Sequence, residues 1–229
     1  MSGNPIVVGD RLYVGLSSSE QGRYARDPSY VYTFRGSMVA VDIHTGRIDW
    51  RTYTMPENPA GTSDWAGGAI VTTPSADLAR NTLYIVTDHL YSQPQSVTDC
   101  LIRARGDWDA SCYPADYRQN SLIAMDLATG KVKWSFLGSG LDAWEYACGK
   151  WPDYWSKEQR GSTEGARNCP LPGDMWNWAF AGGIATVMKT TIDGAERDTI
   201  GVGQKTGIYW MFDADTGKPI WTRWVGPYS

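Results

Sequence analysis

A short motif occurs three times in this chain and constrains its fold more than any other feature. Each copy is a run of alternating character, then Asp-x-x-Thr-Gly, then a second short run that ends in tryptophan. The copies occupy residues 36–50 (GSMVAVDIHTGRIDW), 120–134 (NSLIAMDLATGKVKW) and 206–221 (TGIYWMFDADTGKPIW). Three copies of one motif indicate a repeat architecture, in which each repeat is one supersecondary unit.

The residue types within the motif predict a β-hairpin. The motif aspartates are Asp42, Asp126 and Asp213, the glycines are Gly46, Gly130 and Gly217, and the closing tryptophans are Trp50, Trp134 and Trp221. Alternation over five or six residues is typical of a strand with one buried face. The aspartate can accept hydrogen bonds from its own turn, and the glycine supplies the positive φ that a tight turn needs. We therefore expect three equivalent hairpins.

The composition favours an all-β protein and excludes several partners. Glycine (25 residues) and tryptophan (12 residues) are plentiful among the 229 residues, which fits many short strands with aromatic packing in each repeat. Long patterns with a period of 3.6 residues are absent, and no stretch approaches the roughly 18 apolar residues of a membrane-spanning helix. The net charge of −4 and the pI near 5.2 argue against binding to nucleic acid or to an anionic membrane surface.

Four cysteines lie as two local pairs in polar, loop-like sequence. Cys100 is close to Cys112 in the chain, and Cys148 is close to Cys169. We expect two disulfides, each contributing roughly 3 kcal/mol of stability by restricting the unfolded chain. The alternative is four reduced thiols in a cytosolic protein. A zinc site is disfavoured, because no Cys-x-x-Cys spacing occurs and the two histidines are isolated.

The expected disulfides predict a periplasmic or extracellular protein. The first eight residues, MSGNPIVV, lack the basic start and the long apolar core of a signal peptide. An exported protein without such a signal leads us to expect that the natural N-terminus lies further upstream.

Two further strand candidates precede each hairpin, so the chain divides into three four-stranded units. The candidates are residues 5–8 and 11–16, then 68–74 and 82–87 around a turn at 75–81, then 182–189 and 199–204 around a turn at 190–198. The units span about residues 1–55, 66–138 and 179–226. Such units around an axis form a β-propeller, which needs about 4–8 blades to close. We predict three blades of an incomplete ring, completed by further blades of a longer chain or by self-association.

The connections between the predicted strands are unequal in length. The turns within the strand pairs are short, whereas long segments join the second strand to the third (17–35 and 88–119) and one unit to the next (52–66 and 137–181). In an antiparallel four-stranded blade, these long connections emerge on one face of the propeller, here named the loop face. The opposite face, which carries the short turns, is named the turn face. We expect the functional residues on the loop face.

Segments spread over nearly the whole chain carry a resemblance to a known family. Besides the repeat VAVDIHTGRIDW, they are residues 32–36 (YTFRG), 73–84 (TPSADLARNTLY), Cys148 with the NCP at 168–170, and above all 201–227 (GVGQKTGIYWMFDADTGKPIWTRWVGP). The chain resembles the propellers of dehydrogenases that depend on pyrroloquinoline quinone (PQQ), and most closely the polyvinyl-alcohol dehydrogenase-like family. The resemblance implies an eight-bladed quinoprotein with PQQ and Ca²⁺ at its axis. A carboxylate there acts as base on an alcohol, whose carbon loses a hydride to the quinone.

The resemblance implies calcium ligands at Glu20, His89 and Asn177, and it places the catalytic base at Asn177 as well. The family pattern has Asn where this chain has His89, and Asp where it has Asn177. An amide accepts no proton usefully, and losing a general base typically costs about 10²–10⁴-fold in rate. Carboxylates also dominate the affinity of a site for calcium. Asp88 or Asp174 could take over if the register shifts by a residue or two.

The resemblance also implies contacts to PQQ. Lys205 takes the position of a cation that hydrogen-bonds the quinone oxygens, and Arg35 lies in a matching segment. The vicinal cysteines that stack on PQQ in the family correspond to Val31 and Tyr32, and the opposing tryptophan falls near Ile70. Tyr32 could itself replace one of these platforms.

Three functions remain open from the sequence. The first is a segment of an exported PQQ- and Ca²⁺-dependent dehydrogenase that oxidises a small or polymeric alcohol and passes electrons to a cytochrome c. The second is a non-catalytic propeller that binds or scaffolds a partner, because the base and metal positions carry Asn177 and His89. The third is a glycan-binding face built from loop aromatics, namely Trp144, Trp151, Tyr154 and Trp155.

Overall fold

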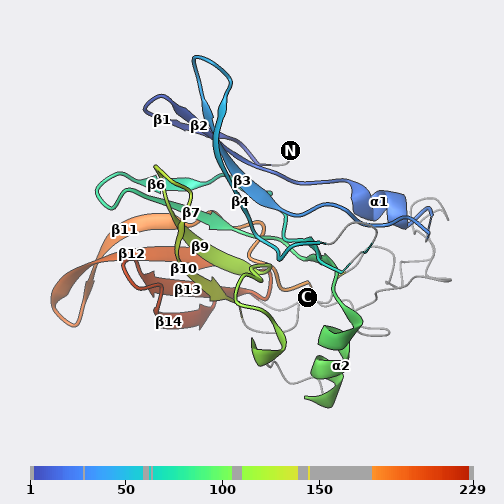
Figure 1. Cartoon of the computed structure of the whole chain (residues 1–229). Coiled ribbons are helices and arrows are strands. Elements are labelled where there is room, and N and C mark those ends of the chain that lie inside the picture. The colour runs from blue at the N-terminus through green and yellow to red at the C-terminus, as the bar shows by residue number, and fades with distance from the viewer. Residues whose placement is uncertain are drawn as a thin grey trace.

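The computed structural model describes residues 3–27, 29–58, 62, 64–104, 110–138, 144 and 177–226. This part of the chain is nearly all antiparallel β-sheet, with three four-stranded sheets spread like the ribs of a fan (Figure 1). The predicted all-β propeller fold with three four-stranded blades is confirmed, and the ring is not closed.

Each four-stranded sheet is one blade with its strands in chain order from edge to edge. Blade 1 holds β1 (Ile6–Val8), β2 (Arg11–Gly15), β3 (Ser37–Asp42) and β4 (Ile48–Tyr53). Blade 2 holds β6 (Ser75–Asp77), β7 (Thr82–Val86), β9 (Ser121–Asp126) and β10 (Val132–Leu137). Blade 3 holds β11 (Thr186–Ile192), β12 (Ala195–Gly203), β13 (Ile208–Asp213) and β14 (Pro219–Trp224).

The remaining elements lie in the long connections. The strands β5 (Ala66–Gly67) and β8 (Leu90–Ser92) pair with each other. The helices are α1 (Glu20–Tyr24), α2 (Gln95–Arg103) and the short 3-10 turn η1 (Ala110–Cys112). Figure 1 shows α1 and α2 on the right of the fan, away from the short turns on the left. None of the helices in the described part is long and apolar enough to cross a membrane.

Two strand predictions were wrong. The first strand of blade 2 is β6, at residues 75–77, whereas residues 68–74 form no strand. Gly68 has a φ of +62° and donates its N–H to the His89 carbonyl, so this segment belongs to the loop face. In blade 3, the turn expected over 190–198 is only Asp193-Gly194, with φ of +51° and +78°. Asp-Gly is a favoured two-residue hairpin turn, and it lets β11 and β12 extend further than expected.

Each motif aspartate organises its own turn, as the sequence predicts. Asp42 Oδ1 accepts hydrogen bonds from the N–H and the hydroxyl of Thr45, both at 2.8 Å. The Gly46 N–H closes the turn on the Asp42 carbonyl at 2.9 Å. The Thr45 hydroxyl, followed by its N–H, lowers the pKa of the Asp42 carboxyl. Asp126 and Asp213 repeat the same contacts in blades 2 and 3.

The closing tryptophan of blade 1 packs on the glycine turn of blade 2. A β-carbon added to Gly130 would overlap the ring of Trp50, so only glycine leaves room for this contact. Trp50 Nε1 donates to the Leu127 carbonyl at 3.3 Å, and the Tyr13 hydroxyl donates to the same oxygen at 3.0 Å. Thr52 Oγ1 donates to the Gly130 carbonyl at 2.7 Å. One turn of blade 2 therefore holds three side chains of blade 1.

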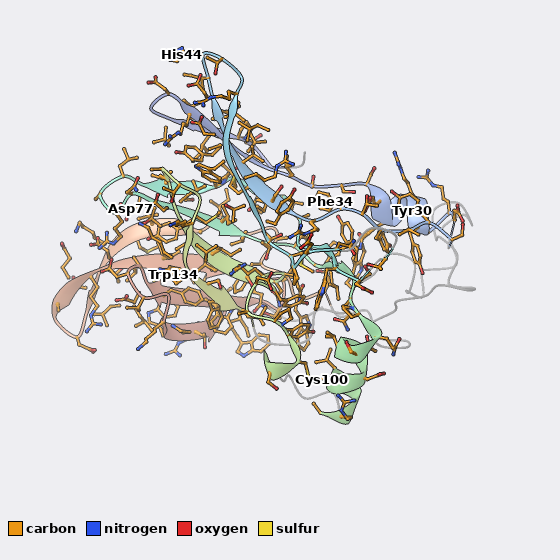
Figure 2. The ribbon with its side chains drawn as sticks, in the orientation of Figure 1. Tyr30, Phe34, His44, Asp77, Cys100 and Trp134 are labelled. Carbon is orange, nitrogen blue, oxygen red and sulfur yellow. A yellow bond between two sulfur atoms is a disulfide. The ribbon has the colours of Figure 1, made fainter. Side chains whose placement is uncertain are left out.

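The junction between blades 2 and 3 has the same design. Trp134, which lies among the sheets in Figure 2, covers Gly217 and donates to the Ala214 carbonyl at 3.1 Å. The Tyr84 hydroxyl donates to that carbonyl at 3.3 Å. The third tryptophan, Trp221, remains 37% exposed.

Ion pairs and apolar packing complete the junctions. Arg80 reaches from blade 2 to Asp215 of blade 3 at 2.8 Å while also pairing with Asp77 at 3.1 Å and with Asp198. The apolar cores lie between neighbouring blades. The core between blades 1 and 2 includes Tyr13, Met38, Leu83, Ile85, Ile123 and Met125, and the core between blades 2 and 3 includes Tyr84, Leu122, Ile200, Val202 and Phe212.

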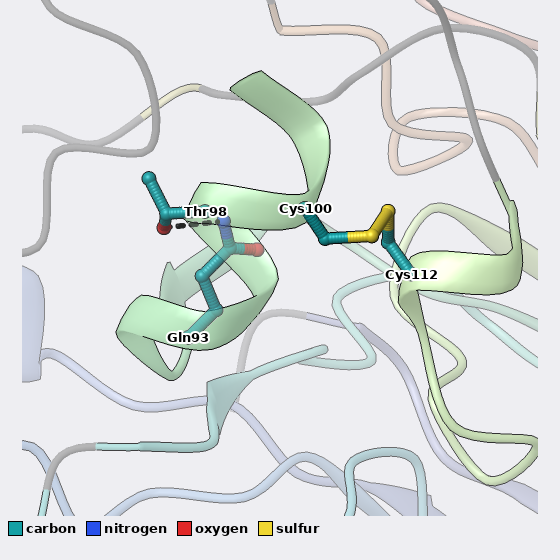
Figure 3. The surroundings of a disulfide bond; sticks show 4 residues. All are labelled: Gln93, Thr98, Cys100 and Cys112. Carbon is teal, nitrogen blue, oxygen red and sulfur yellow. Dashed lines mark hydrogen bonds between the residues drawn. A yellow bond between two sulfur atoms is a disulfide. The ribbon is translucent and has the colours of Figure 1, made fainter. Parts of the chain in front are cut away.

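A disulfide joins Cys100 of α2 to Cys112 of η1, with the Cα atoms 5.7 Å apart (Figure 3). The first predicted disulfide is therefore confirmed. The helix packs its buried Val97 and Leu101 against Trp65 of the preceding connection, so the bridge fixes a folded part of the loop face. The second predicted pair, Cys148 with Cys169, lies outside the described residues.

Replacing Gly130 and Gly46 separately by alanine tests the tryptophan contact. Both glycines have a φ of +71°, so each substitution carries the same backbone strain. Only Gly130 has a ring above it, since nothing lies within 4 Å of a β-carbon at Gly46. Overpacking adds to the cost at Gly130, so we expect Gly130→Ala to lower the free energy of unfolding by roughly 1–3 kcal/mol more than Gly46→Ala. Urea denaturation measures the difference, and equal losses would contradict the packing role.

Candidate functional site

Side chains from three connections of the loop face meet around Asp88. Asp88 Oδ1 lies 2.7 Å from His89 Nδ1 and 3.3 Å from Lys205 Nζ. Lys205 Nζ also donates to Asn177 Oδ1 at 3.0 Å. We name Asp88, His89, Asn177 and Lys205 the Asp88 cluster. The structure thus brings together His89, Asn177 and Lys205, and it sets beside them Asp88, which the sequence offered as a replacement ligand.

Backbone hydrogen bonds fix the cluster in place. The Asp88 N–H donates to the Ala69 carbonyl at 2.8 Å, and the Asp88 carbonyl accepts from the Asn120 N–H at 3.3 Å. The Lys205 N–H donates to the Ala179 carbonyl at 3.1 Å. Asp88 follows the last residues of β7, and Lys205 follows β12, so each side chain starts from the end of a buried strand. The Asp88 cluster therefore lies next to the ends of two hydrogen-bonded strands, β7 and β12, which hold its backbone in place.

Asp88 is a buried carboxylate that stays ionised. Only 8% of the residue is exposed. Burial on its own would raise the pKa of the Asp88 carboxyl, but the contact with the His89 ring and the charge of Lys205 outweigh it and hold the pKa well below the usual range. The contact with His89 Nδ1 is short but poorly aligned for a hydrogen bond, so we treat it as an electrostatic contact.

His89 connects the cluster to α1. Its Nε2 lies 2.8 Å from Gln21 Oε1, and its ring meets the edge of Trp144 with the centroids 4.4 Å apart. Sequence reasoning missed Gln21, although it directly follows the predicted ligand Glu20. No local pattern distinguishes the two, because the contact depends on how α1 packs against the connection after β7.

The Glu20 carboxylate faces its own loop. It accepts hydrogen bonds from the Tyr30 hydroxyl at 2.9 Å and from the Thr33 hydroxyl at 2.6 Å. It also accepts from the N–H groups of Thr33 at 3.1 Å and Phe34 at 2.9 Å. Figure 2 shows Tyr30 and Phe34 at the same end of the molecule, beside α1. Glu20 therefore closes the 20–34 loop on itself.

The other expected PQQ contacts also have internal partners. Tyr32 is fully buried, with ring centroids 4.8 Å from Tyr24 and 5.6 Å from Tyr91. Arg35 donates to the Met55 carbonyl at 2.9 Å and lies 4.0 Å above the ring of Tyr53. Neither residue has a contact with Lys205 or Asn177 among those described. Of the glycan-face aromatics, Trp151, Tyr154 and Trp155 lie outside the described residues, as does Asp174.

The donor set of the described residues does not fit a calcium ion. Calcium takes six to eight oxygen ligands, with carboxylates supplying most of the affinity. The Glu20 oxygens face four donor groups, and Asn177 Oδ1 accepts from Lys205. No group of three or more His, Cys, Asp or Glu residues in the described part could hold a metal ion. We therefore derive no catalytic step through calcium.

Lys205 fits one oxygen of a quinone or a carboxylate. Its side chain is 35% exposed, and two of its three N–H bonds are used by Asp88 and Asn177. The third N–H has no partner within the described part of the chain. An ammonium that is fixed by two acceptors and about one third exposed to solvent can bind an anionic group without reorganising.

Comparison with known proteins supports the resemblance that the sequence suggests. No family model matches the chain. Over its full length it is 29% identical to a polyvinylalcohol dehydrogenase of a Pseudomonas species, and over 97% of its length it is 31% identical to that of Sphingopyxis sp.. The resemblance to the quinoprotein alcohol dehydrogenases is confirmed. The chain spans 31% and 30% of these two relatives.

The solved structures agree on the fold. A quinohemoprotein alcohol dehydrogenase from Comamonas testosteroni matches 98% of this chain with a TM-score of 0.61 and 20% identity, over 28% of its own length. At this identity the likeness shows the propeller fold. A function must be argued from the residues of the Asp88 cluster, because one fold can host many functions.

Replacing Asp88 by asparagine tests the electrostatics of the cluster. The variant leaves Lys205 and His89 without their anion, so we expect a loss of roughly 3 kcal/mol at pH 7. Because the folded-state pKa is depressed, this stability is present above the unfolded-state pKa of about 4 and is lost as the pH falls further. Urea denaturation should show a smaller difference between the two proteins at pH 3 than at pH 7.

Glu196→Gln is the matched control, since Glu196 forms an exposed ion pair with Lys189 at 3.2 Å. An exposed pair contributes little, so this variant should lose less than about 1 kcal/mol. A cost for Asp88→Asn as small as that of the control would show that the cluster does not stabilise the fold.

Proposed function

We propose that this chain is part of an exported quinoprotein that oxidises an alcohol to a carbonyl, with PQQ as hydride acceptor. The observation that carries the proposal is the Asp88 cluster, which sets a fixed cation beside an ionised carboxylate on the loop face. Relatives named polyvinylalcohol dehydrogenase match nearly the whole chain, which supports the same reaction class.

The chemistry needs a group to take the hydroxyl proton while a hydride leaves the carbon. PQQ, when bound, supplies the hydride acceptor. Asn177 cannot take the proton, because an amide is not a useful base. Asp88 is the carboxylate of the cluster, and its contacts with His89 and Lys205 keep it ionised at neutral pH. We assign proton acceptance to Asp88, and its low pKa makes it a weak base, so the rate should be modest.

Substrate, compartment and partners follow from the same proposal. The substrate is a small or polymeric alcohol, by analogy with the named relatives. The disulfide between Cys100 and Cys112 fits a periplasmic or extracellular protein, because such bonds persist in oxidising compartments. A cytochrome c would accept the electrons, and further blades would complete the propeller.

A non-catalytic propeller that binds or scaffolds a partner is the second candidate. Two observations favour this binding module. The Glu20 carboxylate is hydrogen-bonded by its own loop, and Asn177 carries an amide, so both positions lack the free carboxylate that the reaction class uses. The two candidates differ in a measurable way, since only the first predicts that bound PQQ is reduced by an alcohol.

Reconstitution with PQQ tests the proposal. We expect the protein, incubated with PQQ and Ca²⁺ and freed of excess cofactor, to retain the quinone absorbance and to reduce a dye when polyvinyl alcohol or a small alcohol is added. Lys205→Met should weaken PQQ binding about tenfold, since a charge-assisted hydrogen bond contributes roughly 1.5–3 kcal/mol. Lys189→Met is the control, because Lys189 is 65% exposed and lies away from the cluster on β11.

Each outcome decides between the candidates. No retained PQQ in the wild-type protein overturns the enzyme proposal. Retained PQQ without alcohol-dependent dye reduction favours the binding module. Equal PQQ affinity in Lys205→Met and wild type would remove Lys205 from the cofactor site.

A further inference from the structure

A cation of the protein itself lies where oxygen donors from two segments of the loop face meet. Lys205 Nζ is 3.0 Å from Asn177 Oδ1 and 3.3 Å from Asp88 Oδ1. Both oxygens accept its N–H bonds, so each already faces a positive charge. Because Asp88 is buried, salt in the solvent screens this pair only weakly. Among the described residues of the cluster, the charges of Asp88 and Lys205 cancel, which leaves no net negative charge there to attract a divalent ion.

The carboxylate of Glu20, which the resemblance implies as a metal ligand, is occupied by donors of its own loop. Glu20 is surrounded by the hydroxyls of Tyr30 and Thr33 and by the N–H groups of Thr33 and Phe34. A metal ion could reach the Glu20 oxygens only by displacing these donors and opening the loop. His89 offers nitrogen to an ion that prefers oxygen, and its Nε2 is already 2.8 Å from Gln21 Oε1.

We infer that the ammonium of Lys205 takes the place of the divalent cation in this chain, so that the loop face works without Ca²⁺. What the site does rests on the proposed function, but whether it binds a metal ion does not. Any hard cation entering between Asp88 and Asn177 would meet the like charge of Lys205 within a few ångströms. The ammonium supplies a fixed positive charge there without needing an ion from solution.

A variant that lacks the ammonium uncovers the two oxygens that Lys205 faces. Removing Lys205 leaves a buried carboxylate and an amide oxygen facing the same space, which is a donor pair suited to a hard cation. Loss of the lysine should therefore create metal affinity instead of abolishing it. A merely structural role for Lys205 would not produce a gain of binding.

Terbium luminescence measures this gain directly. Tb³⁺ binds oxygen donors as Ca²⁺ does, and a nearby tryptophan sensitises its emission. Trp144 packs on His89 and so lies beside the cluster. We expect no saturable emission from the wild-type protein, and saturable emission from Lys205→Ala that Ca²⁺ displaces, with an affinity at least tenfold higher than in wild type. The double variant Lys205→Ala with Asp88→Asn should lose it, and Lys189→Ala should behave as wild type.

The outcomes separate this inference from the proposed function. Saturable Tb³⁺ binding by the wild-type protein that Glu20→Gln abolishes would overturn it, because the metal would then use the family position. Absence of binding in both wild type and Lys205→Ala would also overturn it, because the ammonium would not be replacing an ion. Should Lys205→Ala fail to fold, the midpoint of thermal unfolding of the wild-type protein with and without Ca²⁺ decides, and a rise of several degrees contradicts the inference.

PQQ retention in the presence of a chelator is measured separately. A protein that keeps PQQ without Ca²⁺ supports both the function and the inference. A protein that binds neither PQQ nor Tb³⁺ refutes the enzyme proposal while leaving the metal-free site intact.

Discussion

The contact between a tryptophan ring and the glycine turn of the next blade is the interaction on which the rest of the structure depends. Trp50 and Trp134 fill the space that a side chain at Gly130 or Gly217 would occupy, and each satisfies a carbonyl of the turn that it covers. A buried polar group is thereby paired while two sheets are held at a fixed spacing. The aspartate of every turn keeps its glycine in place. The second motif both receives the ring of Trp50 at Gly130 and supplies Trp134 to Gly217.

The two junctions share this contact and differ in their charges. Arg80 ties blade 2 to blade 3 through Asp198 and Asp215, whereas Arg11 of blade 1 pairs with Asp49 of the same blade. The first junction therefore relies on rings, hydroxyls and apolar packing, and the second adds an ion-pair network. Networks contribute more than isolated surface pairs, so the second junction has the larger electrostatic share.

Local patterns predicted the hairpins, but contacts between distant segments decided the rest. The Asp-x-x-Thr-Gly turns form from neighbouring residues, so the sequence alone predicted them. The strand at 75–77 was missed because three residues ending in an aspartate show no alternation. The family resemblance assigned His89, Asn177 and Lys205 to one candidate site, and the structure brings the three side chains together. The position of Glu20 could not be predicted, since its partners come from an insertion, residues 30–34, whose path depends on the packing of Tyr32.

The opposite placement of the short turns and the long loops affects how such a protein can change over generations. A substitution in a turn disturbs the contact with the adjoining blade, whereas a substitution around Asp88 changes the loop face and leaves the contacts between the blades in place. Substitutions that affect the contacts between blades and substitutions that affect the candidate site therefore fall on opposite faces of the molecule. A propeller of this kind can therefore vary in the residues around Asp88 and still be built from the same blades.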